Sequence, residues 1–131
     1  MKKLYTLIIL CVLILSLSAC GGMAISSEMY NEISDYVTQN IDDFSPEKET
    51  EFYDYKATGL STGGVNYGYY YSDKNEFLIP DFYSGNDLSA MQTDMREDDG
   101  GVYFGKPNNG TDWCFIKKIS DSWYYYELHC A

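Results

Sequence analysis

The chain has 131 residues and a net charge of −11, because 20 acidic side chains outnumber 9 basic ones. This length fits one small domain and excludes the TIM barrel and the α/β-hydrolase fold, which need about 200 residues or more. The acidic surplus argues against nucleic-acid binding, since phosphates require a basic surface. Hydrophobic residues make up 45% of the chain, enough for a folded core, and 14 residues are tyrosine.

The N-terminus has the pattern of an export signal. Lys2 and Lys3 precede an almost unbroken apolar run over 4–17, and the sequence at 17–20 is Leu-Ser-Ala-Cys. The apolar run is shorter than the about 20 residues that span a bilayer. It has instead the length of the hydrophobic region of a signal peptide.

This N-terminus resembles the signal of bacterial lipoprotein precursors, in which a leucine and two small residues precede a cysteine. The resemblance covers residues 1–22, including Gly21 and Gly22 after the cysteine. It implies that the sulfur of Cys20 receives a diacylglyceryl group and that signal peptidase II cuts just before Cys20. Acyl chains such as palmitate then hold the protein to the membrane. The alternative interpretations are an ordinary secretory signal and an uncleaved anchor.

The resemblance divides the chain into a signal peptide at 1–19, a lipidated tether at 20–27 and a single globular domain at 28–131. Each buried methylene contributes about 0.8 kcal/mol, so two or three acyl chains on one cysteine anchor a protein stably. The tether reaches less than about 30 Å, which keeps the domain close to the lipid. We therefore expect an extracytoplasmic protein on a bacterial membrane, and without the signal its net charge is −13.

A helix is predicted over roughly 27–41. Apolar side chains recur there at every fourth position, at 25, 29, 33, 37 and 41, which is the spacing of one helix face. Ser26 or Ser27 is suited to cap the start of the helix. Because the polar face lacks Lys and Arg, we interpret the helix as packing on a core rather than lying on a membrane surface.

After this helix the sequence is β-prone and rich in aromatic residues. The spacing of Leu88, Met91 and Met95 predicts one further short helix, capped by Asn86 or Asp87. An N-terminal amphipathic helix followed by a mostly antiparallel meander sheet of about five to six strands is an α+β fold. The expected strands lie at 51–60, 64–71, 76–79, 102–105, 112–119 and 122–129.

Two cysteines remain in the expected domain, Cys114 and Cys130. In an oxidising compartment an isolated pair predicts a disulfide, and closing this loop contributes roughly 3 kcal/mol on the chain-entropy model. The simplest hairpin register, however, places Cys114 opposite Glu127, so a bulge or a curled tail must bring Cys130 back. Two free, buried thiols are the alternative.

The aromatic strands are the most informative part of the domain. Side chains alternate along a strand, so Trp123 and Tyr125 share one face, and Tyr124 and Tyr126 share the other. If one face of the sheet stays wet, some of these rings form an exposed binding platform, since Tyr and Trp are enriched in binding hot spots. The alternative is that both faces are covered. The candidate platform residues are Tyr67, Tyr69, Tyr71, Trp123, Tyr124, Tyr125 and Tyr126.

Motifs for catalysis or metal binding are few. Residues 59–63 match G-x-S-x-G, with Ser61 as a nucleophile and His129 as its base, but the following sequence predicts a strand where a nucleophile elbow needs a helix. We interpret the motif as a turn. A calcium site is one interpretation of an acidic cluster that could supply hard oxygen ligands, although no EF-hand loop is present, and an exposed loop is the other. Those carboxylates are Asp94, Glu97, Asp98 and Asp99.

We therefore assign neither a cofactor nor a catalytic residue, and expect a non-enzymatic protein. The first hypothesis is a small acidic binding module for a protein, peptide or envelope glycan, including an inhibitor or immunity type. Its negative charge favours a basic partner and speeds their encounter. The alternatives are a structural accessory of an envelope complex and a small envelope hydrolase.

Overall fold

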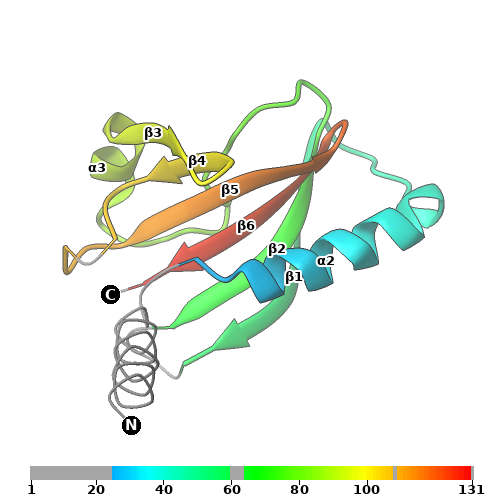
Figure 1. The fold of residues 1–131 in the computed structure, drawn as a ribbon. Coiled ribbons are helices and arrows are strands. Elements are labelled where there is room, and N and C mark those ends of the chain that lie inside the picture. Colours follow the sequence, from blue (N-terminus) through cyan, green and yellow to red (C-terminus); the bar gives the residue numbers. More distant parts are fainter. Residues whose placement is uncertain (1–24, 60–63, 108, 131) are drawn as a thin grey trace, which may run out of the picture.

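The computed structural model describes residues 25–59, 64–107 and 109–130. Neither of the α-helices within these residues is long and apolar enough to cross a bilayer. The elements in chain order are α2 (Ser27–Asn40), the 3-10 turn η1 (Ile41–Asp43), β1 (Thr50–Thr58), β2 (Val65–Ser72), α3 (Leu88–Thr93), β3 (Met95–Asp98), β4 (Gly101–Phe104), β5 (Trp113–Ser120) and β6 (Trp123–His129) (Figure 1).

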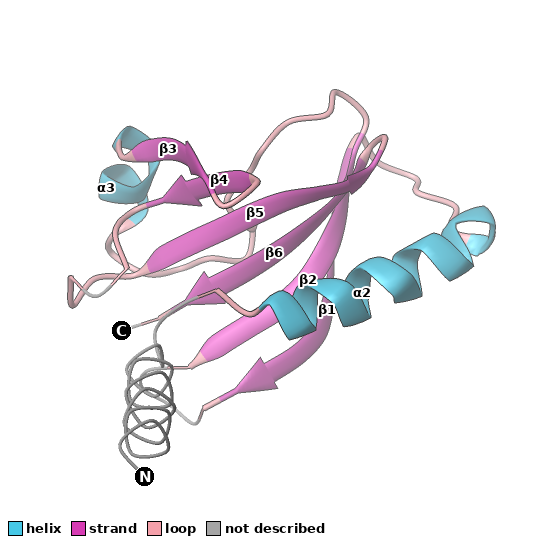
Figure 2. Cartoon of the chain, viewed as in Figure 1, coloured by secondary structure: helices cyan, strands magenta, loops and turns pink. Residues whose placement is uncertain are grey.

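Six strands form one antiparallel sheet in the order β1-β2-β6-β5-β4-β3. The predicted α+β class and the antiparallel pairing are confirmed. The expected simple meander is wrong at one point, because β6 returns to pair with β2 in the middle of the sheet. The chain between β2 and β3 must therefore cross a face of the sheet to reach the opposite edge (Figure 2).

Residues 76–79 belong to this crossing and are not the predicted strand. Strand β2 is already paired on both sides, with β1 and β6, so no edge of β2 remains for another strand. Residues 77–83, here called the crossing segment, instead lie against the sheet, where Leu78 and Ile79 pack on its core. The apolar residues that predict a strand here pack instead against one face of the sheet.

The helix α2 covers one face of the sheet, the helix face. The hydroxyl of Ser26 accepts a hydrogen bond of 3.1 Å from the backbone N–H of Met29 and caps the helix start. Met29, Ile33 and Val37 recur at every fourth position and are buried. They pack against a cluster that includes Tyr69, Tyr103, Trp113, Phe115, Trp123 and Tyr125.

The opposite face, here called the far face, is covered by the crossing segment and by α3. Its core consists of Tyr70, Met91, Val102, Phe104, Cys114, Ile116, Tyr124, Tyr126 and Leu128. With both faces covered, every residue of β6 is buried. β6 is therefore the central strand of the domain, and neither of its faces is exposed to solvent.

The predicted aromatic platform is therefore wrong, although the predicted alternation of its rings between the two faces is confirmed. Tyr69 is 6% exposed and the rings of 123–126 are at most 5% exposed. Tyr67 and Tyr71 are half-buried at the edge of the helix-face cluster. These rings fill the two cores, because the crossing segment and α3 cover the far face, which the sequence-based prediction leaves exposed to solvent.

Candidate functional site

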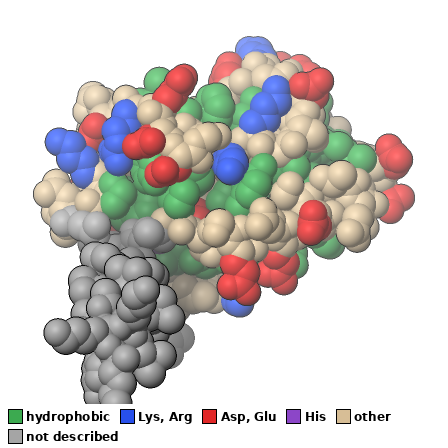
Figure 3. Space-filling view, viewed as in Figure 1, with side chains coloured by type: hydrophobic (Ala, Val, Ile, Leu, Met, Phe, Trp, Pro, Cys, Tyr) green, Lys and Arg blue, Asp and Glu red, His purple; other side chains and the backbone are tan. Residues whose placement is uncertain are grey.

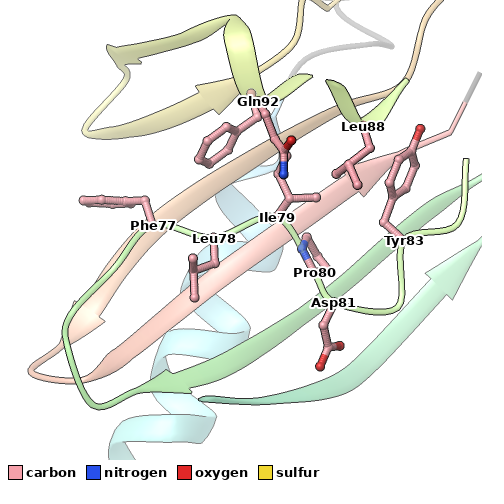
Figure 4. A pocket seen from close by; sticks show the side chains of 9 residues that line it. Phe77, Leu78, Ile79, Pro80, Asp81, Tyr83, Leu88 and Gln92 are labelled. Atoms are coloured by element: carbon pink, nitrogen blue, oxygen red, sulfur yellow. The ribbon is translucent and has the colours of Figure 1, made fainter. Parts of the chain in front are cut away.

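The far face carries an open hollow of about 380 Å³ between the crossing segment and α3. Leu88 and Gln92 reach down from α3 toward Ile79, while the ring of Tyr83 stands beside Leu88 (Figure 4). Asp81 points away from the hollow in the same view. We call this space the apolar hollow, and its lining consists of Phe77, Leu78, Ile79, Pro80, Asp81, Tyr83, Leu88, Gln92 and Phe104.

Hydrogen bonds fix the first half of the crossing segment. The buried phenol of Tyr70 donates to the carbonyl of Glu76 at 2.8 Å and accepts from the N–H of Leu78 at 3.0 Å. The hydroxyl of Ser72 accepts from the N–H of Glu76 at 3.0 Å. Because these hydrogen bonds hold the loop against the sheet, the loop forms a fixed wall of the apolar hollow.

A second network fixes the other end of the wall. The phenol of Tyr83 donates to the carboxylate of Asp112 at 2.5 Å and accepts from the N–H of Asp87 at 3.2 Å. The carboxylate of Asp87 accepts in turn from the N–H of Asp112 at 3.0 Å. Burial and the Asp112 carboxylate raise the pKa of Tyr83 to about 12, so the phenol stays neutral and keeps donating.

The hollow is bordered by large apolar side chains that remain exposed to solvent. Phe77 is 36% and Leu88 is 38% exposed. The ring of Phe77 rests edge-on against Tyr124 with the ring centroids 5.2 Å apart, so its position is fixed. Large apolar side chains gathered at the mouth of a preformed hollow are typical of a binding surface.

A second hollow of about 400 Å³ adjoins the first and shares Phe77 with it. We call it the acidic hollow, because Glu97 and Asp98 are among its lining residues and both are exposed. The other lining residues are Gly100, Gly101 and Val102. Both hollows border Phe77, and we call the two together the groove.

The helix face has a different character. Acidic and basic side chains are interspersed over it (Figure 3). The guanidinium of Arg96 lies over the ring of Tyr103, 4.5 Å from its centroid, and the ammonium of Lys117 lies over Tyr30 at 4.2 Å. Both Tyr30 and Tyr103 belong to the helix-face cluster. These two cations near β3 and β4 are therefore engaged on the face opposite the groove.

A buried carboxylate lies on the helix face near the start of α2. Glu127 is 0% exposed and accepts hydrogen bonds from the N–H of Ser26 at 2.8 Å and from the phenol of Tyr125 at 2.5 Å. Its other oxygen lies 2.7 Å from Nε2 of His129. Burial, followed by the Glu127 charge, raises the pKa of Tyr125, so the phenol remains a donor. This arrangement satisfies a charge in the core and attaches β6 to the helix start.

His129, the single histidine of the sequence, belongs to this cluster rather than to the groove. Its ring stacks on Trp113 with the centroids 3.7 Å apart, and it is 7% exposed. Its predicted partner in the G-x-S-x-G motif, Ser61, lies outside the described residues. The described contacts of His129 are those of a packed side chain on the helix face.

The predicted disulfide is absent, and Cys114 and Cys130 are free thiols. An irregularity between Lys118 and Ser120 sets the register, so Cys114 faces Leu128 and not Glu127. Cys130 then follows the last paired residue, as a diagonal neighbour of Cys114. Diagonal neighbours lie roughly 7–8 Å apart, farther than a disulfide bridges. Burial raises the pKa of both thiols, which makes them poor nucleophiles.

The acidic residues considered as calcium ligands are dispersed. Asp94 pairs with Lys106 at 4.0 Å, and the Asp99 carboxylate accepts from the phenol of Tyr103 at 2.7 Å. Glu97 and Asp98 line the acidic hollow. Across the described parts of the chain, no three His, Cys, Asp or Glu side chains gather as a metal site would require.

Sequence reasoning missed the groove itself. Its exposed members, Phe77 and Leu88, fall in the predicted strand 76–79 and in the predicted short helix. The signal that could have identified them is an apolar run, 77–80, that ends at a proline and is followed by Phe82 and Tyr83 within one loop.

Comparisons of the chain with protein-family models, with curated proteins and with solved structures found no match.

Proposed function

We propose that this chain is a membrane-anchored, extracytoplasmic bacterial lipoprotein whose domain is a small acidic binding module. The partner is a protein, and it docks on the far face in the groove between the crossing segment and α3. The anchor proposal rests on the signal-like N-terminus and on Cys20. The binding proposal rests on the groove.

The observation that carries the binding proposal is the pair of exposed side chains, Phe77 and Leu88, at the mouth of a hollow with a fixed wall. Binding to a preformed surface avoids the entropy of ordering a loop. Apolar side chains that insert into such a hollow are typical anchors of protein interfaces. The hydrogen bonds of Tyr70 and Tyr83 support this role because they hold the wall in place before a partner arrives.

The location of the groove also supports binding rather than catalysis. The groove lies on the far face, whereas His129 lies on the helix face among Trp113 and Glu127. A general base must reach the proton that it removes, and this histidine is separated from the groove by the sheet. The negative charge of the domain favours a partner with a basic surface.

Site-specific photo-crosslinking tests this proposal in intact cells. A photoreactive amino acid replaces Leu88 in the full-length protein, and a matched variant carries it at Tyr36, which is similarly exposed (39%) on the helix side. The proposal predicts a defined protein adduct from position 88, absent from position 36 and lost when Phe77→Ser is added. Equal adducts from both positions, or none from position 88, would contradict it.

A further inference from the structure

We propose that the groove recognises an extended polypeptide segment in which an apolar side chain and a Lys or Arg side chain are separated by one residue. The apolar side chain occupies the apolar hollow and the basic side chain occupies the acidic hollow. This inference rests on the proposed binding function and adds the chemistry of the partner. It follows from the spacing of the hollows, from their lining and from the distribution of charge between the two faces.

The spacing comes from β4. Phe104 lines the apolar hollow and Val102 lines the acidic hollow. Both side chains belong to the far-face core, two residues apart on one strand. A strand rises about 3.3 Å per residue, so the two positions are about 6.6 Å apart. An extended partner segment has the same repeat, which matches side chains at positions i and i+2 to the two hollows.

The apolar hollow selects an aliphatic or aromatic side chain. Its lining includes the apolar side chains of Ile79, Leu88 and Phe104, and Gln92 supplies a neutral amide. Asp81, the acidic residue of the lining, points away from the space (Figure 4). A charged side chain placed here would lose water without gaining an opposite charge.

The acidic hollow selects a cation. Glu97 and Asp98 are exposed, and among the described residues neither forms an ion pair with a Lys or Arg side chain. The cations near them, Arg96 and Lys117, lie over aromatic rings of the helix face.

Glu97 is paired with Val102 of the far-face core, so its carboxylate lies on the side of the hollow, next to Phe77. Asp98 shares the face of Arg96 by strand alternation and adds its negative charge at the end of β3. A basic side chain gains both the charge interaction and contact with the ring of Phe77.

Selection from a library of random linear peptides, displayed on phage, tests the inference. The target is the full-length lipoprotein held in lipid nanodiscs. The expected consensus has an apolar and a basic residue separated by one position, in either order, because an extended segment can lie in the groove in either direction. Two double variants then test which hollow binds which side chain of the peptide. Phe77→Ser with Leu88→Ser alters the apolar hollow, and Glu97→Gln with Asp98→Asn removes the charge of the acidic hollow.

The charge-matched control is Asp42→Asn with Asp43→Asn, which removes two exposed carboxylates from η1. For a selected peptide, the Glu97 and Asp98 double variant should weaken binding about threefold to tenfold at low salt, as expected for exposed ion pairs. The control should leave binding within twofold or so of the native protein. Fluorescence anisotropy of the dye-labelled peptide measures both, and circular dichroism verifies that each variant is folded.

The outcomes separate this inference from the binding proposal. Selected peptides that need Phe77 and Leu88 but lack a basic residue, or carry it at another spacing, would overturn the inference and leave the binding proposal intact. Equal weakening by the Glu97 and Asp98 variant and by the η1 control would also overturn it. If no selected peptide depends on Phe77 and Leu88, the groove is not a binding site and both proposals fail.

Discussion

The backbone N–H of Ser26 donates a hydrogen bond of 2.8 Å to the carboxylate of Glu127, a residue 101 positions later in the sequence. This bond attaches the start of α2 to β6, the strand that is buried on both faces. The same Ser26 caps α2 through its side chain. The expected tether ends here, so any pull from a lipid anchor at Cys20 acts on the centre of the sheet rather than on a fraying end.

Removing the charge of Glu127 should destabilise the domain. In Glu127→Gln the Tyr125 phenol, the Ser26 N–H and the His129 ring lose a charged acceptor. Hydrogen bonds to charged groups contribute about 1.5–3 kcal/mol each, so we expect the free energy of unfolding to fall by at least about 2 kcal/mol. Denaturant unfolding followed by circular dichroism measures this.

The matched control for this change is Glu49→Gln. Its carboxylate has a side-chain exposure of 78% and lies 4.0 Å from Lys74, an arrangement that contributes little to stability. The free energy of unfolding should change by no more than about 0.5 kcal/mol in this variant. Equal midpoints for the two variants would show that Glu127 is not a structural acceptor.

The wall of the apolar hollow should loosen in Tyr83→Phe. This variant keeps the ring but removes the phenol that bonds to Asp112 and to the N–H of Asp87. We expect a loss of about 1 kcal/mol in unfolding free energy and faster hydrogen exchange over 81–87. Tyr71→Phe is the control, since its phenol makes only a 3.5 Å contact to Asp73. Unchanged exchange over 81–87 would contradict the proposed fixed wall.

Alkaline pH should unfold the domain through its tyrosines. The pKa of Tyr53 and of Tyr83 rises from 10.0 to about 12, chiefly by burial, and burial also raises the pKa of Tyr70 and Tyr126. A raised pKa in the folded state contributes stability that is complete below pH 10.0 and is lost as the pH rises through about 12.

Tyrosinate absorbance and circular dichroism, recorded together on one titration, measure this behaviour. Most tyrosines should ionise in step with unfolding above pH 10.0, whereas in denaturant they should titrate near 10.0. Ionisation of the whole set near pH 10.0 with the native spectrum retained would contradict the packing of these phenols in the two cores.

The thiols of Cys114 and Cys130 should be present but slow to react. Burial raises both pKa values, and Cys114 is 0% exposed. In the native protein a thiol reagent should label Cys130 slowly and Cys114 only after denaturation, and a reductant should leave the melting temperature unchanged. Protein isolated without reductant that has no reactive thiol in denaturant would indicate the disulfide that the structure lacks.

The final hairpin shows how far the sequence determines the fold. Residues 112–119 and 122–129 flank a turn and are rich in aromatic and β-branched residues, and the structure forms β5 and β6 there. Their alternation also placed Trp123 and Tyr125 on one face and Tyr124 on the other. These features depend on local spacing, which a sequence displays directly.

Burial and register depend on distant contacts. The rings of β6 are covered on the far face because residues 77–83 cross the sheet and α3 packs beside them, and no local pattern distinguishes that crossing from a returning strand. The position of Cys114 depends on the irregularity near Ser120. Glu127 is one of 20 acidic residues, and only its place beneath Ser26 makes it different. The groove is a product of such contacts, so the sequence alone did not reveal it.

Mass spectrometry of the protein isolated from bacterial membranes tests the central claim, a binding module held at the membrane surface. The account predicts a mature chain that starts at Cys20 and carries a diacylglyceryl thioether on its sulfur. A chain that retains residues 1–19, or one with an unmodified Cys20, would contradict the anchor and with it the proposed location of the groove.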